Sequence, residues 1–227
     1  MNAPLHRWPF HAALLACLAR PAVVSHISAA RLLGLPLPPG PLDPRVCVTR
    51  RAPAPTNDPL EGDVHVVDYD EADVLDVAGV PVLAGARLIL DCCDALQPDS
   101  ALAVADAALA RRLVTPIGLK EALRRRRTRS RAADRIAELV VDRADPLAAN
   151  WFESSSRWWL LEAGLPRPRL QVPFRDKRGR TATVDMLIGR VVGEADGAGK
   201  YDEPGALFAE KLREDWLRDV HRVEVVR

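Results

Sequence analysis

Two short apolar strands with acidic residues inside them stand out in the pattern of polar and apolar positions. Residues 182–188 alternate and are rich in β-branched side chains, and a second run covers residues 190–194. Asp185, Glu194 and then Asp196 stand where these strands should bury apolar surface. A carboxylate inside a strand is costly unless it is paired or binds a metal. The pattern therefore predicts a hairpin, turning near Gly189, that gathers three carboxylates into a divalent-metal site.

Upstream of this hairpin, the apolar spacing predicts mainly helices. Helical periodicity covers residues 10–19, 25–33, 87–96, a segment capped by Ser100, 119–127 and 132–141. Ser25 and Gly34 suit the start and the end of the second helix, which would carry His26 as a packed histidine. Short extended segments are predicted at 46–49, 64–68 and 79–82. Residues 142–146 then break the last helix, which predicts two domains, 1–145 and 146–227.

The C-terminal part shows a different order of elements. A helix at 148–163 ends at Gly164, with Pro166 following, which is typical of a helix C-terminus. A strand at 170–174, the two hairpin strands, a helix at 206–219 and a strand at 222–226 come next. We therefore expect an α+β protein. An α-rich N-terminal module with a small sheet would precede an α-β-β-β-α-β core.

Composition limits the location and the partners of the chain. Lys and Arg total 32 and Asp and Glu total 31, so no global charge draws the protein to nucleic acid or membrane. No apolar run approaches the roughly 18 residues of a membrane helix, and the N-terminal apolar run lacks a clean cleavage site. The four cysteines, Cys17, Cys47, Cys92 and Cys93, show no C-x-x-C spacing. We expect reduced thiols, a cytoplasmic protein and no membrane partner.

The strongest local charge is an arginine run at the end of the helix at 119–127. It comprises Arg124, Arg125, Arg126 and Arg127. Such a run can hold the phosphates of nucleic acid. The alternative is a solvated helix end, where cations also suit the helix dipole.

Five segments of residues 153–227 are informative together: in order, FESSSRWWLLEAGLP, VDMLI, VVGEADG, EKLRED and RVEVVR. This part of the chain resembles the PD-(D/E)xK nuclease core, and more narrowly the bacterial proteins related to the very-short-patch-repair (Vsr) endonuclease. Glu153 lies in the first segment, Asp185 in the second, and Glu194 and Asp196 in the third. The resemblance implies a restriction-endonuclease-like fold for this core and DNA as its partner.

The resemblance also implies a chemistry, metal-dependent hydrolysis of phosphodiester bonds. Mg²⁺ or Mn²⁺ would be held by Asp185, Glu194 and Asp196, while Glu153 would bind a second ion or orient water. Where the nuclease motif has a lysine, two residues after the Glu, this chain has Asp196. Lys200 would then supply the cation that meets the charge on the phosphate, or Asp196 would serve as an extra ligand.

Several of these residues have structural alternatives. Glu153 and Arg157 have the i, i+4 spacing of a helix salt bridge. Lys211 and Arg213, on the predicted helix at 206–219, are candidates for DNA contacts and also for pairing with the acidic site. Trp158 and Trp159 are adjacent, so one should face the core and the other the surface, with base stacking as the functional alternative.

The upstream segments SHISAARLLGLPL, GVPVLAGARLILDCCDAL and ADAALARRLVT resemble actinobacterial proteins grouped with the AbiEi-type antitoxins of type IV toxin–antitoxin systems. Those proteins usually begin with a DNA-binding winged helix, and this chain begins near the point where it would have ended. The resemblance implies a cognate toxin as a partner.

The leading hypothesis is a metal-dependent DNA endonuclease. Its alternatives are a catalytically inert DNA-binding antitoxin or transcriptional regulator, and a truncated fragment without activity of its own.

Overall fold

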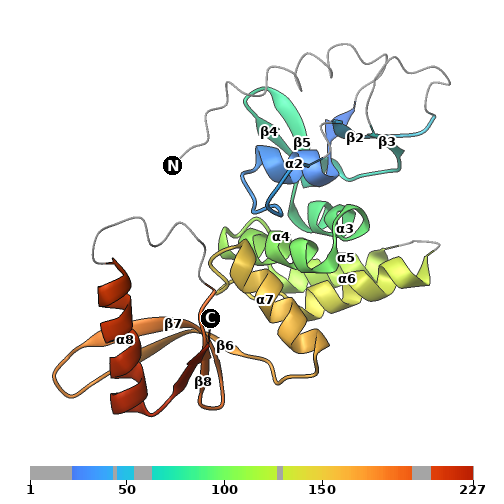
Figure 1. Ribbon diagram of the computed structural model, residues 1–227. Helices are drawn as coiled ribbons and strands as arrows, with labels where there is room; N and C mark the ends of the chain where they lie inside the picture. The colour runs from blue at the N-terminus through green and yellow to red at the C-terminus, as the bar shows by residue number, and fades with distance from the viewer. Residues whose placement is uncertain (1–21, 43–44, 54–62, 127–129, 196–205, 227) are drawn as a thin grey trace. The chain divides into compact units, whose positions relative to one another are not determined.

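The computed structural model describes residues 22–42, 45–53, 63–126, 130–195 and 206–226 (Figure 1). The chain divides into two compact units, Met1–Pro146 and Leu147–Arg227, and each has a sheet and helices. The α+β class expected from the sequence is confirmed. The helix predicted at residues 10–19 lies outside the described residues.

The sheet of the N-terminal unit has the strand order β3-β2-β1-β5-β4. The strands are β1 (Val23–Val24), β2 (Cys47–Arg50), β3 (Asp63–Val66), β4 (Val74–Val77) and β5 (Val80–Leu83). β1 pairs antiparallel with β2 and parallel with β5, and β4 and β5 form an antiparallel hairpin. The sequence pattern missed β1, which is too short to alternate, and β4, which is partly exposed and carries Asp76.

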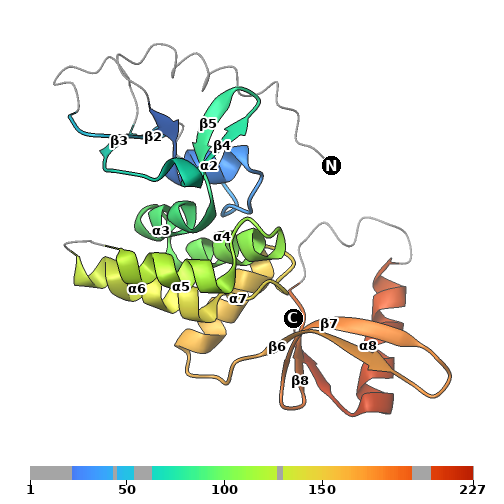
Figure 2. The ribbon, with the colours of Figure 1, turned by 180° about the vertical axis from the view of Figure 1, so that it is seen from behind.

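Helices fill most of the remainder of the N-terminal unit. They are α2 (His26–Leu32), α3 (Gly85–Ala95), α4 (Pro98–Ala110), α5 (Pro116–Arg125) and α6 (Arg131–Arg143), with a 3₁₀ turn, η2 (Glu71–Asp73), before β4. The helix α3 contacts α2, α4, α5 and α6 (Figures 1 and 2). A core of aliphatic side chains from β1, β5, α2, α3 and α4 joins the sheet to these helices.

Residues at the helix ends explain where the helices begin and stop. Thr115 and Ser130 cap α5 and α6, because their hydroxyl groups accept the backbone N–H groups of Gly118 and Ala133. Gly34 ends α2 with φ of +64°. The expectation that Ser100 caps α4 is wrong: the helix begins at Pro98, whose fixed φ suits a first helical position.

The C-terminal unit has the predicted order of elements. It runs α7 (Trp151–Glu162), β6 (Arg169–Arg175), β7 (Thr181–Ile188), β8 (Val191–Gly193), α8 (Ala206–His221) and β9 (Glu224–Val226). The sheet order is β6-β7-β8-β9, with β6, β7 and β8 an antiparallel meander and β9 parallel to β8. Parallel neighbours need a crossover connection, which contains α8.

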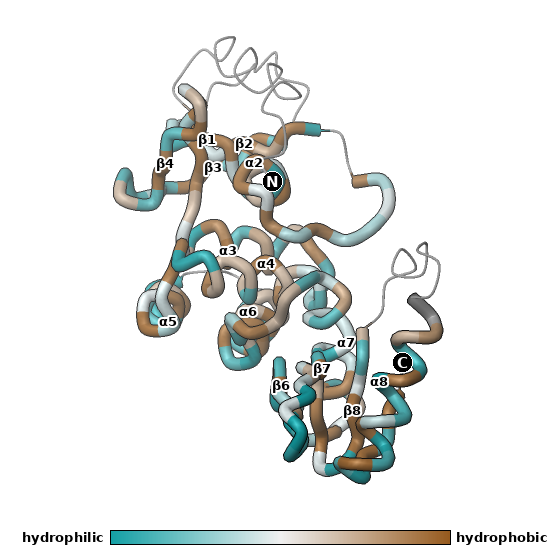
Figure 3. Tube along the Cα trace, turned by 90° about the vertical axis from the view of Figure 1, so that its left-hand side faces the viewer, coloured by the Kyte–Doolittle hydropathy of each residue, from teal (hydrophilic) through white to brown (hydrophobic). Residues whose placement is uncertain are grey.

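The core of this unit forms two clusters. Trp216 and Leu217 of α8 pack with apolar side chains of β6, β7 and β8, including Val184. Leu160 of α7 packs against a second cluster that contains Met186. Figure 3 shows apolar positions in β7 and β8, and a mixture of polar and apolar positions along α8. No helix among the described residues is long and apolar enough to cross a membrane.

Between these two clusters, the side of the β6–β7 ribbon that packs against a helix changes, from the cluster with α8 to the cluster with α7. Val184 belongs to the cluster with α8, and Met186, two residues on, belongs to the cluster with α7. Residues two apart share a face in a regular strand, so the ladder must be irregular here. The irregular residue is Gln171 in β6, with φ of +48°, which falls opposite Asp185 in the register. The strand distortion therefore coincides with the first predicted metal ligand.

Candidate functional site

Asp185 lies in the middle of β7, at the point where the ribbon changes face. Its side chain is half-buried, and Oδ2 accepts the backbone N–H of Ala195 at 2.9 Å. That hydrogen bond joins β7 to the residue directly after Glu194. The hairpin therefore brings Asp185 to the end of β8, as the alternating pattern predicted.

Glu194 follows β8 directly and is the most buried acid of the hairpin. Its side chain is 2 % exposed, and its Oε1 lies 2.9 Å from Nη2 of Arg213. The pair is ionic, because the contact is not aligned as a hydrogen bond. Burial raises the pKa of Glu194 to about 7; the Arg213 guanidinium opposes this shift, and the neighbouring Asp185 carboxylate adds to it.

Arg213 comes from α8 and contacts several groups around this pair. Its Nη2 also donates to the carbonyl oxygen of Thr183 at 2.6 Å, and its Nη1 donates to Oε1 of Glu210 at 2.9 Å. Burial lowers the pKa of Arg213, but the charges of Glu194 and Glu210 outweigh this effect and leave it raised. The guanidinium thus stays charged and bridges α8, β7 and the end of β8.

Glu153 helps to cap the start of α7. Asn150 caps the helix by accepting the backbone N–H of Glu153 at 3.0 Å, and the Glu153 carboxylate accepts the N–H of Ala149 at 2.9 Å. This exchange is a form of capping box. The same carboxylate accepts the Nε2 amide of Gln171 at 3.1 Å. Glu153 therefore holds the distorted residue opposite Asp185.

The described residues do not assemble the full metal site that the sequence predicts. Asp185 and Glu194 come together, but no group of three His, Cys, Asp or Glu side chains in the described ranges is arranged to hold a metal ion. Within those ranges, Glu153 therefore does not complete the pair. Asp196 and Lys200, the other predicted members, lie outside the described residues.

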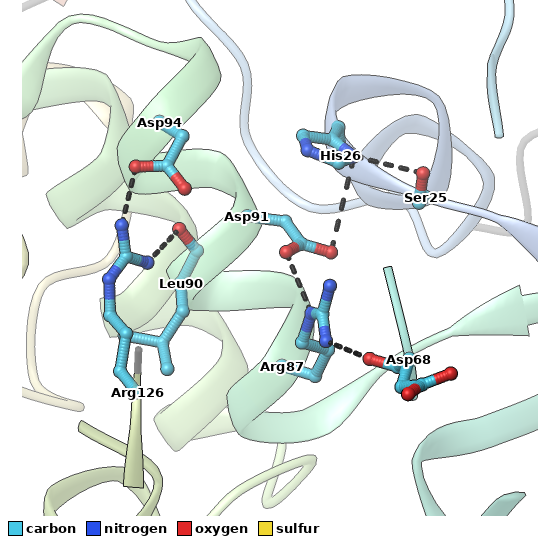
Figure 4. A network of polar contacts seen from close by, with 8 residues as sticks. All are labelled: Ser25, His26, Asp68, Arg87, Leu90, Asp91, Asp94 and Arg126. Carbon is cyan, nitrogen blue, oxygen red and sulfur yellow. Dashed lines mark hydrogen bonds and ion pairs between the residues drawn. The ribbon is translucent and has the colours of Figure 1, made fainter. Parts of the chain in front are cut away.

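The arginine run divides into residues with different surroundings. Arg124 and Arg125 are exposed on α5, and Arg127 lies outside the described residues. Arg126 is 9 % exposed; its Nη2 lies 2.5 Å from Oδ1 of Asp94, and its Nη1 donates to the carbonyl oxygen of Leu90 (Figure 4). These contacts tie the end of α5 to α3, so they give Arg126 a structural role. On α8, the predicted DNA contact Lys211 is exposed.

A second polar cluster, which the sequence analysis did not identify, lies in the N-terminal unit (Figure 4). Arg87 Nε donates to Oδ1 of the buried Asp91 at 2.8 Å, and Oδ2 of Asp91 lies 4.0 Å from Nδ1 of His26. The ring of His26 stacks on that of His65 with centroids 3.7 Å apart. Burial lowers the pKa of His26 to about 3 and raises that of Asp91 to about 6. A neutral His26 packs against α3, as expected of a packed histidine.

Two further expectations can be compared with the structure. Trp158 is 3 % exposed and Trp159 is 62 % exposed, which confirms that the adjacent pair faces in two directions. Cys47, Cys92 and Cys93 are free thiols and all three are buried; burial raises the pKa of Cys93 to about 12.

Comparisons with known proteins add no assignment to this geometry. No protein-family model matches the chain, and no curated protein or solved structure matches it either. The resemblances to Vsr-related and AbiEi-type proteins therefore stay predictions.

Proposed function

We propose that the C-terminal unit hydrolyses phosphodiester bonds of DNA with the help of Mg²⁺ or Mn²⁺. The observation that carries this proposal is that Asp185 in β7 lies beside Glu194, which follows β8 directly and has an almost fully buried carboxylate. Two close carboxylates repel each other and are costly to bury. Arg213 balances one of these charges, and a bound divalent cation would balance the other.

The donor set suits a hard divalent cation. Asp185 and Glu194 offer carboxylate oxygens, which Mg²⁺ and Mn²⁺ prefer, and Mg²⁺ usually keeps several waters beside one or two carboxylates. The buried Oε1 of Glu194 has no aligned hydrogen bond among the described residues. When bound, such an ion polarises the phosphate and lowers the pKa of a water molecule.

The chain's own residues would bind and position the substrate. Asp185 is held by the N–H of Ala195, so its orientation is fixed before substrate arrives. Arg213 offers a guanidinium beside the carboxylate pair, where negative charge would develop on the phosphate. Exposed Lys211 on the same helix suits the backbone of a nucleic acid. These features support DNA as the substrate class.

Cleavage of supercoiled plasmid tests this proposal. We expect the full chain to nick the plasmid with Mg²⁺ or Mn²⁺ and not with EDTA. The variants Asp185→Asn and Glu194→Gln should lose at least about 100-fold of the rate, since each removes a ligand of the essential ion. Asp219→Asn, an exposed change on α8, is the matched control and should cleave normally. Intact plasmid with every metal would exclude the endonuclease.

A second function, DNA binding without catalysis, is favoured by the ion pair of Glu194 and Arg213, which balances one buried charge without a metal. In that case the protein would be an antitoxin-like regulator, with a toxin as a further partner. It should shift DNA in a gel with EDTA present and lose affinity steeply with salt. Changing Arg124 and Arg125 to Ser should weaken binding, while changing Arg135, an exposed arginine of α6, should weaken it less. Equal effects of these changes would contradict this assignment.

A further inference from the structure

One cation already contacts Glu194, the buried carboxylate of the pair in the C-terminal unit. Nη2 of Arg213 lies 2.9 Å from Oε1 of Glu194, while Nη1 is anchored on Glu210, three residues earlier in the same helix. Because Nη2 also donates to the Thr183 carbonyl at 2.6 Å, the guanidinium has two anchors besides Glu194. The contact to Glu194 can open while the contact to Glu210 remains.

The exposure and geometry of the Glu194–Arg213 contact suit its replacement by a metal ion. The Glu194 side chain is 2 % exposed and the Arg213 side chain 24 % exposed, so Arg213 is the partner of this contact that solvent reaches. The contact is ionic and is not aligned as a hydrogen bond. An attraction that is mainly between opposite charges is open to replacement by a cation of higher charge.

A divalent ion and the guanidinium would repel each other if both contacted Glu194. The ion would be held by Asp185 and Glu194 together, whereas the guanidinium contacts Glu194 and the Thr183 carbonyl. Once released, the planar guanidinium presents donors in the geometry that matches a phosphate. It would remain at the exposed rim of the site, where a DNA backbone can approach.

We propose that Arg213 is the resident counter-ion of Glu194. A divalent metal displaces Arg213 from Glu194, and the released Arg213 then binds the phosphodiester of the substrate. This inference rests on the proposed function, because it uses the same carboxylate pair. It assigns to α8 the positive charge that the chain lacks at residue 196, where an aspartate stands. Metal binding and substrate binding are thereby coupled through one side chain.

Calorimetric titration with Mn²⁺ tests the displacement. Arg213→Met should bind Mn²⁺ about tenfold more tightly than the wild type, because the competing charge is gone. Arg218→Met is the matched control: this arginine lies on the same helix and pairs with Glu214 at 2.8 Å, away from the carboxylate pair. It should leave the affinity unchanged. Equal affinities in the wild type and Arg213→Met, or no Mn²⁺ binding in either, would overturn the proposal.

DNA binding with Ca²⁺ in place of Mg²⁺ tests the second half. Arg213→Met should weaken DNA binding about fivefold in Ca²⁺, where the guanidinium is free, and leave it unchanged in EDTA, where it is on Glu194. A loss that is the same in Ca²⁺ and EDTA would contradict the exchange. Because this readout is binding, it stays informative if the protein never cleaves DNA; only the plasmid assay addresses the hydrolase itself.

A measurement on the wild type covers the case in which Arg213→Met does not fold. The Nε–H resonance of Arg213, assigned by NMR, should shift on titration with Mg²⁺ while that of Arg218 stays in place. The change should follow a saturable binding curve, and its midpoint should agree with a calorimetric titration of the same protein with Mg²⁺. A resonance of Arg213 that does not respond to Mg²⁺ would overturn the displacement.

Discussion

Replacing Glu194 with glutamine should stabilise the metal-free protein above neutral pH. Burial, opposed by Arg213 and reinforced by Asp185, raises the pKa of Glu194 from 4.5 to about 7. Because the folded-state pKa lies above the unfolded one, the carboxyl group stabilises the fold fully below pH 4.5, and this contribution is lost as the pH rises through about 7. The shift is equivalent to about 3 kcal/mol.

Urea unfolding in EDTA measures this effect. Between pH 5 and pH 8, the stability of Glu194→Gln relative to the wild type should rise by roughly 2 to 3 kcal/mol, since only the wild type carries the titrating carboxyl group. Asp219→Asn, on the exposed side of α8, should show no such rise. Adding Mn²⁺ at pH 8 should then stabilise the wild type and not Glu194→Gln. If the difference in unfolding free energy between Glu194→Gln and the wild type stays constant from pH 5 to pH 8, burial of the charged Glu194 side chain does not destabilise the fold.

Three further predictions concern the scaffold and are also measured by urea unfolding. Gln171→Val should cost about 2 kcal/mol, because a β-branched residue is strained at positive φ; Gln171→Gly should cost less, and equal losses would contradict the role of the backbone. Asn150→Ala should cost about 1 kcal/mol by removing the cap of α7, and no loss would argue against that cap. Asp91→Asn should make the effect of His26 on the pH dependence of stability measurable. The pKa of His26 is lowered to about 3, so its contribution to the stability of the fold is lost as the pH falls. The pKa of Asp91 is raised to about 6, so its contribution to that stability increases as the pH falls. The variant should therefore lose about 3 kcal/mol between pH 7 and pH 4, where the wild type changes little, and parallel curves would contradict this.

Local patterns were enough to predict the elements of the C-terminal unit. The alternation around Asp185 and the turn at Gly189 predicted the β7–β8 hairpin, and the adjacent pair Trp158 and Trp159 divided between core and surface as expected. These features depend on the period of the chain and on residues close in sequence. The meeting of Asp185 with Glu194 follows from the same hairpin geometry.

The contacts that the sequence did not predict depend on tertiary neighbours. Glu153 looked like a ligand or one half of a helix salt bridge, and the structure makes it part of the cap of α7 and a partner of Gln171. The positive φ of Gln171 has no sequence signal, because glutamine rarely adopts it. Arg126 belongs to an arginine run, but its contacts with Leu90 and Asp94 come from α3, more than thirty residues upstream. Spacing alone could not show these pairings.

Anomalous diffraction from Mn²⁺-soaked crystals tests the central claim most directly. We predict one manganese peak about 2.1 Å from a carboxylate oxygen of both Asp185 and Glu194, with Arg213 moved off Glu194. Crystals of Asp185→Asn should lack this peak. A wild-type structure in saturating Mn²⁺ with no ion between the two carboxylates, and with Arg213 still on Glu194, would contradict the account.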